Sequence, residues 1–201
     1  MKETKRKVLF IILNEYTDWE GAYLAPCLRM GMMPGSPIDY EVKTVGPTSD
    51  VVTSLGGFRI IPDYSFETMP DDYAAIVMPG GMRWDAPEAE SVVPIVKKAI
   101  CQGKIVGAIC NGASFMAKHG FLNNIRHTGN GIEQLRLWGG DAYTNEAGFV
   151  ESQAVSDQNI VTANGTGAIE FTRELLSLLK ADTEERIGQY YDFTKHGFFK
   201  E

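Results

Sequence analysis

Short, continuously apolar segments recur along the chain and are separated by longer segments of mixed polarity. Four of the apolar runs are bounded by Gly, Pro, Asn or Asp, namely Val8–Leu13, Ala74–Met78, Lys104–Cys110 and Asn159–Ala163. Strands of a parallel sheet have this pattern when both of their faces are buried. The pattern therefore predicts four buried strands of a parallel sheet.

Segments of helical length lie between these runs. Glu88–Cys101 and Thr166–Leu179 place apolar residues at the three- and four-residue spacing of one helix face. Trp19–Met30 has the same spacing but contains Pro26, which removes a backbone hydrogen bond and predicts a kinked helix. Strands that alternate with helices predict an α/β fold, with a doubly wound, mostly parallel sheet sandwiched by helices.

Two segments depart from this alternation. In Val51–Phe66, β-branched residues flank Gly56-Gly57, which predicts a small β-hairpin appended to the sheet. The segment Glu184–Phe199 keeps more apolar surface than a solvated tail, so we expect it to dock on the domain, with a subunit interface as the alternative. Its apolar side chains are Ile187, Tyr190, Tyr191, Phe193, Phe198 and Phe199.

Length and charge exclude several classes of protein. The 201 residues contain no internal repeat and no low-complexity linker, so we expect one domain over residues 1–201. The net charge of −7 is dispersed and would repel a phosphate backbone, which argues against a nucleic-acid partner. The longest apolar run is far shorter than the ~20 residues of a membrane helix. We therefore expect neither nucleic acid nor a membrane as a partner.

The three cysteines, Cys27, Cys101 and Cys110, form no Cys-x-x-Cys motif and leave one unpaired. Free thiols fit a reducing compartment better than a disulfide framework does. We therefore expect a cytoplasmic protein.

The run Lys104–Cys110 leads directly into the small residues of Asn111–Ser114. A side chain at such a strand-to-helix corner lies at the carboxyl end of the sheet, where open α/β folds bind ligands. The N–H groups of the next helix favour a thiolate, which predicts a lowered pKa and a nucleophilic Cys110. The alternative is a buried cysteine that only fills the end of the strand.

A second apolar run, Ala75–Met78, ends in Pro79-Gly80-Gly81. Glycines allow the backbone to approach a ligand closely. Beside Cys110, the N–H groups of Gly81 and Asn111 could form an oxyanion hole. The alternative is a simple turn between a strand and a helix.

The order of these motifs is similar to that of the superfamily that joins PfpI-type intracellular proteases, the parkinsonism-associated deglycase, glyoxalase-like chaperones and class I glutamine amidotransferases. The resemblance extends from about residue 7 to residue 180 and implies a flavodoxin-like fold. The matching segments are Gly56-Gly57 with Pro62-Asp63, Pro79–Gly81, Ala108–Gly112 and Asn159–Gly165.

The resemblance implies roles for individual residues. Cys110 matches the nucleophile, and Gly81 and Asn111 match the donors to the oxyanion. Glu20 matches a glutamate that hydrogen-bonds the cysteine. Such a carboxyl must be protonated to donate to a thiolate, so we expect a raised pKa for Glu20 and a lowered one for Cys110. The alternative role for Glu20 is an acid that stabilises the first turn of a helix.

The sequence departs from the family pattern at the histidine that many relatives carry just after the strand that follows the nucleophile's helix. Gly129 occupies that place here. His127 lies two residues earlier, roughly 6 to 7 Å away along an extended strand, which is too far for a direct hydrogen bond to the cysteine without a bulge. We consider His127 as a general base but favour a core or surface histidine. Thr128 and Asn130 are candidate substrate contacts. Trp84, after the glycines, either covers the pocket or anchors its loop.

These observations favour a cysteine hydrolase of the PfpI type that acts through Cys110 on a small-molecule or peptide substrate. The activity would be protease-like, or glyoxalase- or deglycase-like on small aldehydes and their adducts, which tolerates the missing histidine better. We expect no metal and no cofactor, because no ligand cluster or phosphate-binding glycine pattern is present. The family resemblance implies a homodimer.

Three alternative functions make different demands on the sequence. A glutaminase would need a His-x-Glu pair downstream, which Asn164–Gly167 does not contain. A non-enzymatic redox or electrophile sensor, part of a stress response, would use oxidation of Cys110 and needs no histidine. A degenerate binding module would leave Cys110 with an ordinary thiol pKa.

Overall fold

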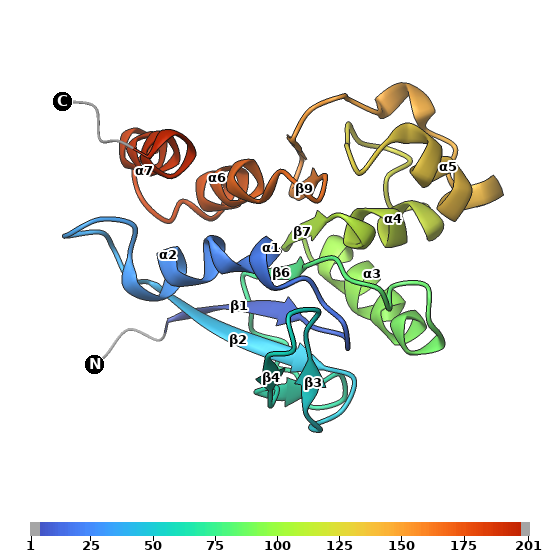
Figure 1. Ribbon diagram of the computed structural model, residues 1–201, viewed down its shortest axis with the longest axis horizontal. Coiled ribbons are helices and arrows are strands. Elements are labelled where there is room, and N and C mark those ends of the chain that lie inside the picture. The colour runs from blue at the N-terminus through green and yellow to red at the C-terminus, as the bar shows by residue number, and fades with distance from the viewer. Residues whose placement is uncertain (1–4, 198–201) are drawn as a thin grey trace.

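A seven-stranded sheet forms the centre of the fold, in the spatial order β5-β2-β1-β6-β7-β9-β8 (Figure 1). The computed structural model describes residues 5–197. All neighbouring strands are parallel except β8 and β9, which are antiparallel. The strands are β1 (Arg6–Ile11), β2 (Tyr40–Gly46), β5 (Tyr64–Ser65), β6 (Ala75–Met78), β7 (Ile105–Ile109), β8 (Ala154–Asp157) and β9 (Ile160–Ala163).

Helices cover both faces of this sheet (Figure 1). One apolar core lies under α3 (Val93–Cys101), α4 (Asn111–Lys118) and α5 (Ile132–Gly139). The other lies under α2 (Leu24–Met30), α6 (Ala168–Leu179) and α7 (Glu184–His196), and the short helix α1 (Asp18–Ala22) contacts α2 and α6. Short 3₁₀ segments are η1 (Pro87–Val92), η2 (Gly140–Ala142) and η3 (Glu146–Gly148). None of the helices within residues 5–197 is both long enough and apolar enough to span a bilayer.

The four predicted buried strands are confirmed, with ends that shift by at most two residues. Each of these strands is buried on both faces, because its consecutive side chains alternate between the two cores. In β1, Leu9 and Ile11 enter one core, whereas Val8 and Phe10 enter the other. A strand with both faces buried needs apolar residues at every position, which gives the continuous runs in the sequence.

The predicted kink in Trp19–Met30 is a break between two helices at Tyr23. Pro26 is the third residue of α2, in the first turn, where a backbone N–H has no partner within the helix. A missing N–H therefore costs little there. The predicted helix Glu88–Cys101 likewise begins with η1 and continues as α3, with Pro94 in the first turn of α3.

The predicted hairpin is also present. Strands β3 (Val52–Thr53) and β4 (Arg59–Ile60) pair as a separate antiparallel sheet, and β5 then joins the main sheet beside β2. Hydrogen bonds fasten the hairpin to residues 14–18, and two of them reach its turn. Leu55 N–H donates to Tyr16 O at 2.9 Å, and Gly56 N–H donates to Asp18 Oδ2 at 2.8 Å.

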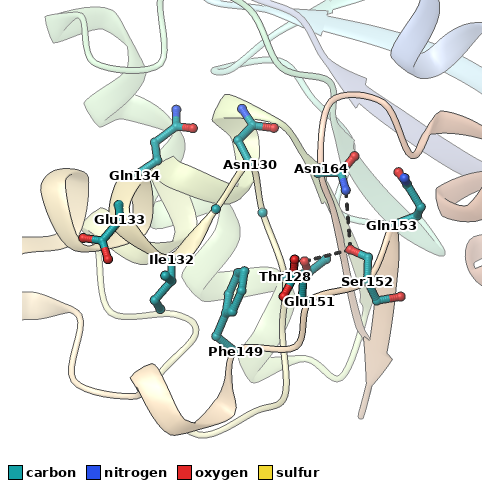
Figure 2. Close-up of a pocket in the computed structure, with 12 residues that line it drawn as sticks. Thr128, Asn130, Ile132, Glu133, Gln134, Phe149, Glu151, Ser152, Gln153 and Asn164 are labelled. Atoms are coloured by element: carbon teal, nitrogen blue, oxygen red, sulfur yellow. Dashed lines mark hydrogen bonds between the residues drawn. The ribbon is translucent and has the colours of Figure 1, made fainter.

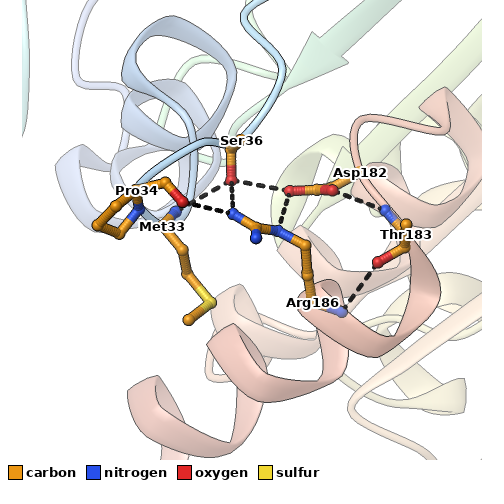
Figure 3. Close-up of polar contacts among 6 residues, drawn as sticks. All are labelled: Met33, Pro34, Ser36, Asp182, Thr183 and Arg186. Carbon is orange, nitrogen blue, oxygen red and sulfur yellow. Dashed lines mark hydrogen bonds and ion pairs between the residues drawn. The ribbon is translucent and has the colours of Figure 1, made fainter.

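Helix α7 docks on the chain's own domain, as predicted for this segment. Ile187 is buried in the core under α2 and α6. The Arg186 guanidinium bridges the start of α7 to the loop after α2 (Figure 3). It contacts Asp182 Oδ2 at 2.9 Å and both Pro34 O and Ser36 Oγ at 3.0 Å. Phe198 and Phe199, also part of the predicted segment, lie outside the described residues.

Candidate active site

Cys110 is the residue between β7 and α4, and its backbone conformation is strained. Its φ of 57° and ψ of −125° lie in a region that residues other than glycine rarely adopt. The position is fixed because Cys110 N–H donates to Ala163 O at 2.9 Å and Cys110 O accepts from Ala113 N–H at 3.0 Å. Such strain costs about 1–3 kcal/mol and is concentrated at functional sites. The geometry is that of a nucleophile at a strand-to-helix corner.

Two glycines allow other chain segments to approach the sulfur. A Cβ on Gly80 would lie 2.7 Å from both Cys110 Cβ and Glu20 Oε2. A Cβ on Gly165 would lie 3.0 Å from Cys110 Sγ. Both positions therefore exclude larger side chains. Gly165 was predicted only as part of a family motif, because its contact with the sulfur depends on the pairing of β7 with β9.

Glu20 enters the site from α1 and is almost fully buried, with 1% of its surface exposed. Its Oε2 accepts a hydrogen bond of 2.5 Å from Gly80 N–H. The carboxyl also hydrogen-bonds the Cys110 thiol. Burial raises the pKa of Glu20 to about 7, although these two hydrogen bonds oppose the shift. The predicted direction for Glu20 is confirmed.

The predicted lowering of the Cys110 pKa is wrong. Burial raises the pKa of this thiol, and the negative charge of Glu20 raises it further. Hydrogen bonds from the Asn130 side chain and Asn111 N–H act in the opposite direction but do not compensate. Two acidic groups that interact this closely titrate as a pair, so one proton is retained between sulfur and carboxyl.

Gly81 lies beside Cys110 in a backbone conformation reserved for glycine, with φ of 143°. It faces Tyr16 in an isolated bridge, whose bonds run from Thr17 N–H to Gly80 O and from Met82 N–H to Glu15 O. The bridge therefore does not use Gly81 N–H.

The Asn111 side chain links the two candidate oxyanion donors. Its Nδ2 donates to Gly81 O at 2.8 Å. Its Oδ1 accepts from Gln134 Nε2, also at 2.8 Å. This pair of bonds fixes the loop of Gly81 relative to the start of α4, so the two backbone N–H groups keep their relative position.

His127 is a core histidine, as the favoured interpretation predicts, and its candidate role as a general base is wrong. The side chain is fully buried, and burial lowers its pKa. Nδ1 lies 2.9 Å from Ile125 O, and Nε2 lies 2.6 Å from the Tyr143 hydroxyl. Both ring nitrogens are thus used within the core, and His127 is not part of the cavity that contains Cys110.

Asn130 supplies the side chain that reaches the sulfur instead. Its Nδ2 donates to Cys110 Sγ at 3.3 Å, and its Oδ1 accepts from Gly165 N–H at 2.8 Å. It was predicted to contact substrate, but the structure places it on the thiol. An amide can orient a thiol and stabilise a thiolate, but it does not transfer a proton as an imidazole does.

The other two predicted binding residues have their polar groups occupied. Trp84 is buried against Phe115, and its Nε1 donates to Pro79 O at 2.8 Å. It anchors the glycine loop and does not cover the pocket. The Thr128 hydroxyl donates to Ser152 O at 2.9 Å, and this residue lines a neighbouring cleft.

A cavity of about 590 Å³ contains Cys110 and Glu20. One part of its wall is apolar and exposed, because Trp19, Leu55 and Met82 keep 53%, 45% and 60% of their surface accessible. Sequence reasoning missed these three residues, because they come from three segments that only the fold brings together. The full lining is Thr17, Trp19, Glu20, Leu55, Gly81, Met82, Cys110, Asn111, Asn130, Asn164, Gly165 and Thr166.

Comparison with known proteins agrees with this fold. The model of the DJ-1/PfpI family matches residues 6–178. Uncharacterized protease YdeA of Bacillus subtilis is 39% identical over 194 residues, which cover 96% of this chain and 93% of that protein. Deglycase PfpI of Pyrococcus furiosus is 30% identical over 181 residues, which cover 87% of this chain and 99% of that protein.

A solved structure has the same fold. The thiJ/pfpI family protein from Bacillus anthracis superposes with a TM-score of 0.89 at 29% identity, covering 98% of this chain and 94% of that one. The class defined by the fold and the site is therefore that of flavodoxin-like proteins with a cysteine at the strand-to-helix corner. Within this class, the chain belongs to the DJ-1/PfpI family.

Proposed function

We propose that this protein is a cysteine-dependent hydrolase of the PfpI type that acts on small aldehydes and their adducts. The observation that carries the proposal is the environment of the Cys110 thiol. Among residues 5–197 its partners are the Glu20 carboxyl, the Asn130 amide and the Asn111 N–H, and no imidazole is among them. The names of the relatives, a protease and a deglycase, support an enzyme over the redox or electrophile sensor.

The first step needs only groups that the site contains. The sulfur of Cys110 attacks the carbonyl carbon, and a C–S bond forms while the carbonyl π electrons move to oxygen. Glu20 takes the thiol proton as the bond forms and returns it to that oxygen, which gives a neutral hemithioacetal. The developing negative charge is stabilised by the N–H groups of Gly81 and Asn111. Glu20 suits this transfer because a pKa of about 7 lets its carboxyl accept and donate at neutral pH.

Peptide cleavage makes a further demand on the site. The leaving amine of a peptide must be protonated as the C–N bond breaks. Asn130 holds the sulfur without a transferable proton, so Glu20 would have to serve both ends of the reaction. Addition to an aldehyde breaks no C–N bond, so it needs no proton donor for a leaving amine. The geometry therefore favours a reactive carbonyl compound over an unactivated peptide.

Turnover of methylglyoxal, of a methylglyoxal adduct of an amino acid and of a fluorogenic peptide tests the proposal. We expect wild-type protein to consume the first two, and Cys110→Ala to lose that activity. Cys101→Ala is the matched control, because Cys101 is an exposed free thiol outside the cavity. Aldehyde turnover by Cys110→Ala at the wild-type rate contradicts the proposed nucleophile. Cleavage of the peptide alone contradicts the proposed substrate class.

A further inference from the structure

A second cleft, of about 830 Å³, lies next to the cavity of Cys110 (Figure 2). Asn130 and Asn164 line both spaces, so the two are neighbours across these side chains. Asn130 is also the residue whose amide contacts the sulfur. A compound with its carbonyl carbon at Cys110 can therefore extend past Asn130 into the second cleft.

The cleft combines an apolar patch with polar groups at its edge. Ile132 and Phe149 are half-buried, and Figure 2 shows them side by side between Glu133 and Glu151. Amide side chains complete the lining toward Cys110, from Gln134, Gln153, Asn130 and Asn164. An aliphatic chain can pack on the apolar patch while a polar end group reaches the rim.

All ionisable side chains that line the cleft are acidic. No Lys, Arg or His occurs among the described residues that line it or the Cys110 cavity. The charge of Glu133 is already paired, because Arg136 contacts its Oε1 at 2.6 Å. Within residues 5–197 the Glu151 carboxylate has neither a hydrogen bond nor an ion pair, and Glu151 is exposed. Its charge is therefore available to a ligand.

We propose that this cleft is a substrate subsite for a cationic aliphatic group. The methylene groups of the substrate pack on Ile132 and Phe149, and its ammonium or guanidinium head pairs with Glu151. A phosphate or carboxylate in the same place meets only acidic and amide side chains and is disfavoured. The inference rests on the proposed function only in taking Cys110 as the reacting atom.

Alkylation of Cys110 tests the subsite without any need for turnover. The reagents are N-alkyl iodoacetamides with chains of two, four or six methylene groups, ending in either an ammonium or a carboxylate. Peptide mass spectrometry gives the rate at Cys110 and, as an internal reference for the overall negative charge, at exposed Cys101. We expect the ammonium reagents to react faster at Cys110, beyond any preference at Cys101, with an optimum at one chain length.

Three variants assign the preference to Glu151. We expect Glu151→Gln to reduce the ammonium-to-carboxylate rate ratio at Cys110 by about fivefold, the effect of losing one exposed ion pair. Glu151→Lys should favour the carboxylate reagents. Glu185→Gln removes an exposed charge on α7 and should leave the ratio unchanged.

Two outcomes overturn the proposed subsite. The first is an equal ratio at Cys110 and Cys101 in wild-type protein. The second is a preference that Glu151→Gln and Glu151→Lys leave intact. Failure of the proposed function looks different, because the alkylation preference would persist while no substrate is turned over.

Discussion

The carboxyl of Glu20 and the thiol of Cys110 hydrogen-bond to each other across a gap that only a glycine at position 80 leaves open. The two residues belong to α1 and to the corner after β7, which lie about ninety residues apart in sequence. Their burial makes two negative charges unfavourable there. The pair therefore stores a proton next to the atom that is proposed to react.

Glu20→Gln should change the reactivity and the activity of Cys110 in opposite directions. Removal of the nearby negative charge lowers the thiol pKa, so alkylation of Cys110 at pH 7 becomes faster. Aldehyde turnover should nevertheless fall by about 10²-fold or more, because the group that moves the proton is lost. Rates of alkylation against pH, together with turnover, check both effects. A slower alkylation than in wild type, or turnover at the wild-type level, would contradict the assigned role.

Glu20 should also make the stability of the fold depend on pH. The carboxyl is protonated in both states below its ordinary pKa of 4.5. Above this value the unfolded chain releases the proton, whereas the folded chain retains it until about pH 7. The free energy of unfolding should therefore fall as pH rises through this window, by about 3 kcal/mol in total. Urea denaturation at pH 4.5 and pH 8 measures this change.

Glu20→Gln is the control for the pH dependence, because glutamine does not titrate. We expect the variant to resemble wild type at pH 4.5 and to be the more stable protein at pH 8. An equal slope of stability with pH in both proteins would show that other groups cause it.

Much of the fold could be predicted because a strand that is buried on both faces gives a continuous apolar run in the sequence. The runs that became β1, β6, β7 and β9 are apolar at almost every position, and their polar residues are Lys104, Asn159 and Thr162. The break at Tyr23 was less visible, since apolar spacing continues across it and only Pro26 marks the irregularity.

The site was predictable where it depends on a local corner and less so where it depends on distant contacts. The strand-to-helix turn at Cys110 is local and was found. The contact of Asn130 with the sulfur depends on how the loop before α5 crosses the end of β9, and no sequence periodicity reports this. The thiol pKa was predicted in the wrong direction, because helix amides are visible in the sequence but the extent of burial is not.

Alanine substitutions at two glycines should have opposite effects on stability, because one glycine lies in the tightly packed site and the other on an open helix surface. Gly80→Ala forces a contact of 2.7 Å with both members of the acidic pair, so we expect a loss of about 1–3 kcal/mol in stability and loss of activity. Gly188→Ala is the matched control in α7, where a Cβ meets nothing within 4 Å. It should stabilise the protein by about 0.5–1 kcal/mol. Urea denaturation and turnover of both variants provide the test, and a fully active Gly80→Ala protein would rule out close packing of Gly80 against Cys110 and Glu20.

Substitution of Asn130 should adjust the thiol pKa in either direction. Asn130→Ala removes a hydrogen bond that favours the thiolate, so the pKa of Cys110 rises and alkylation at pH 7 slows. Asn130→His places an ionisable ring at the same position, and an imidazolium beside the sulfur lowers the thiol pKa. We expect this variant to be alkylated at lower pH than wild type and to gain peptide cleavage, since a proton donor for the leaving amine is then present. Asn124→His, on an exposed loop outside the cavity, is the control that should change neither property. If Asn130→Ala and Asn130→His show the wild-type alkylation profile, Asn130 does not tune the nucleophile.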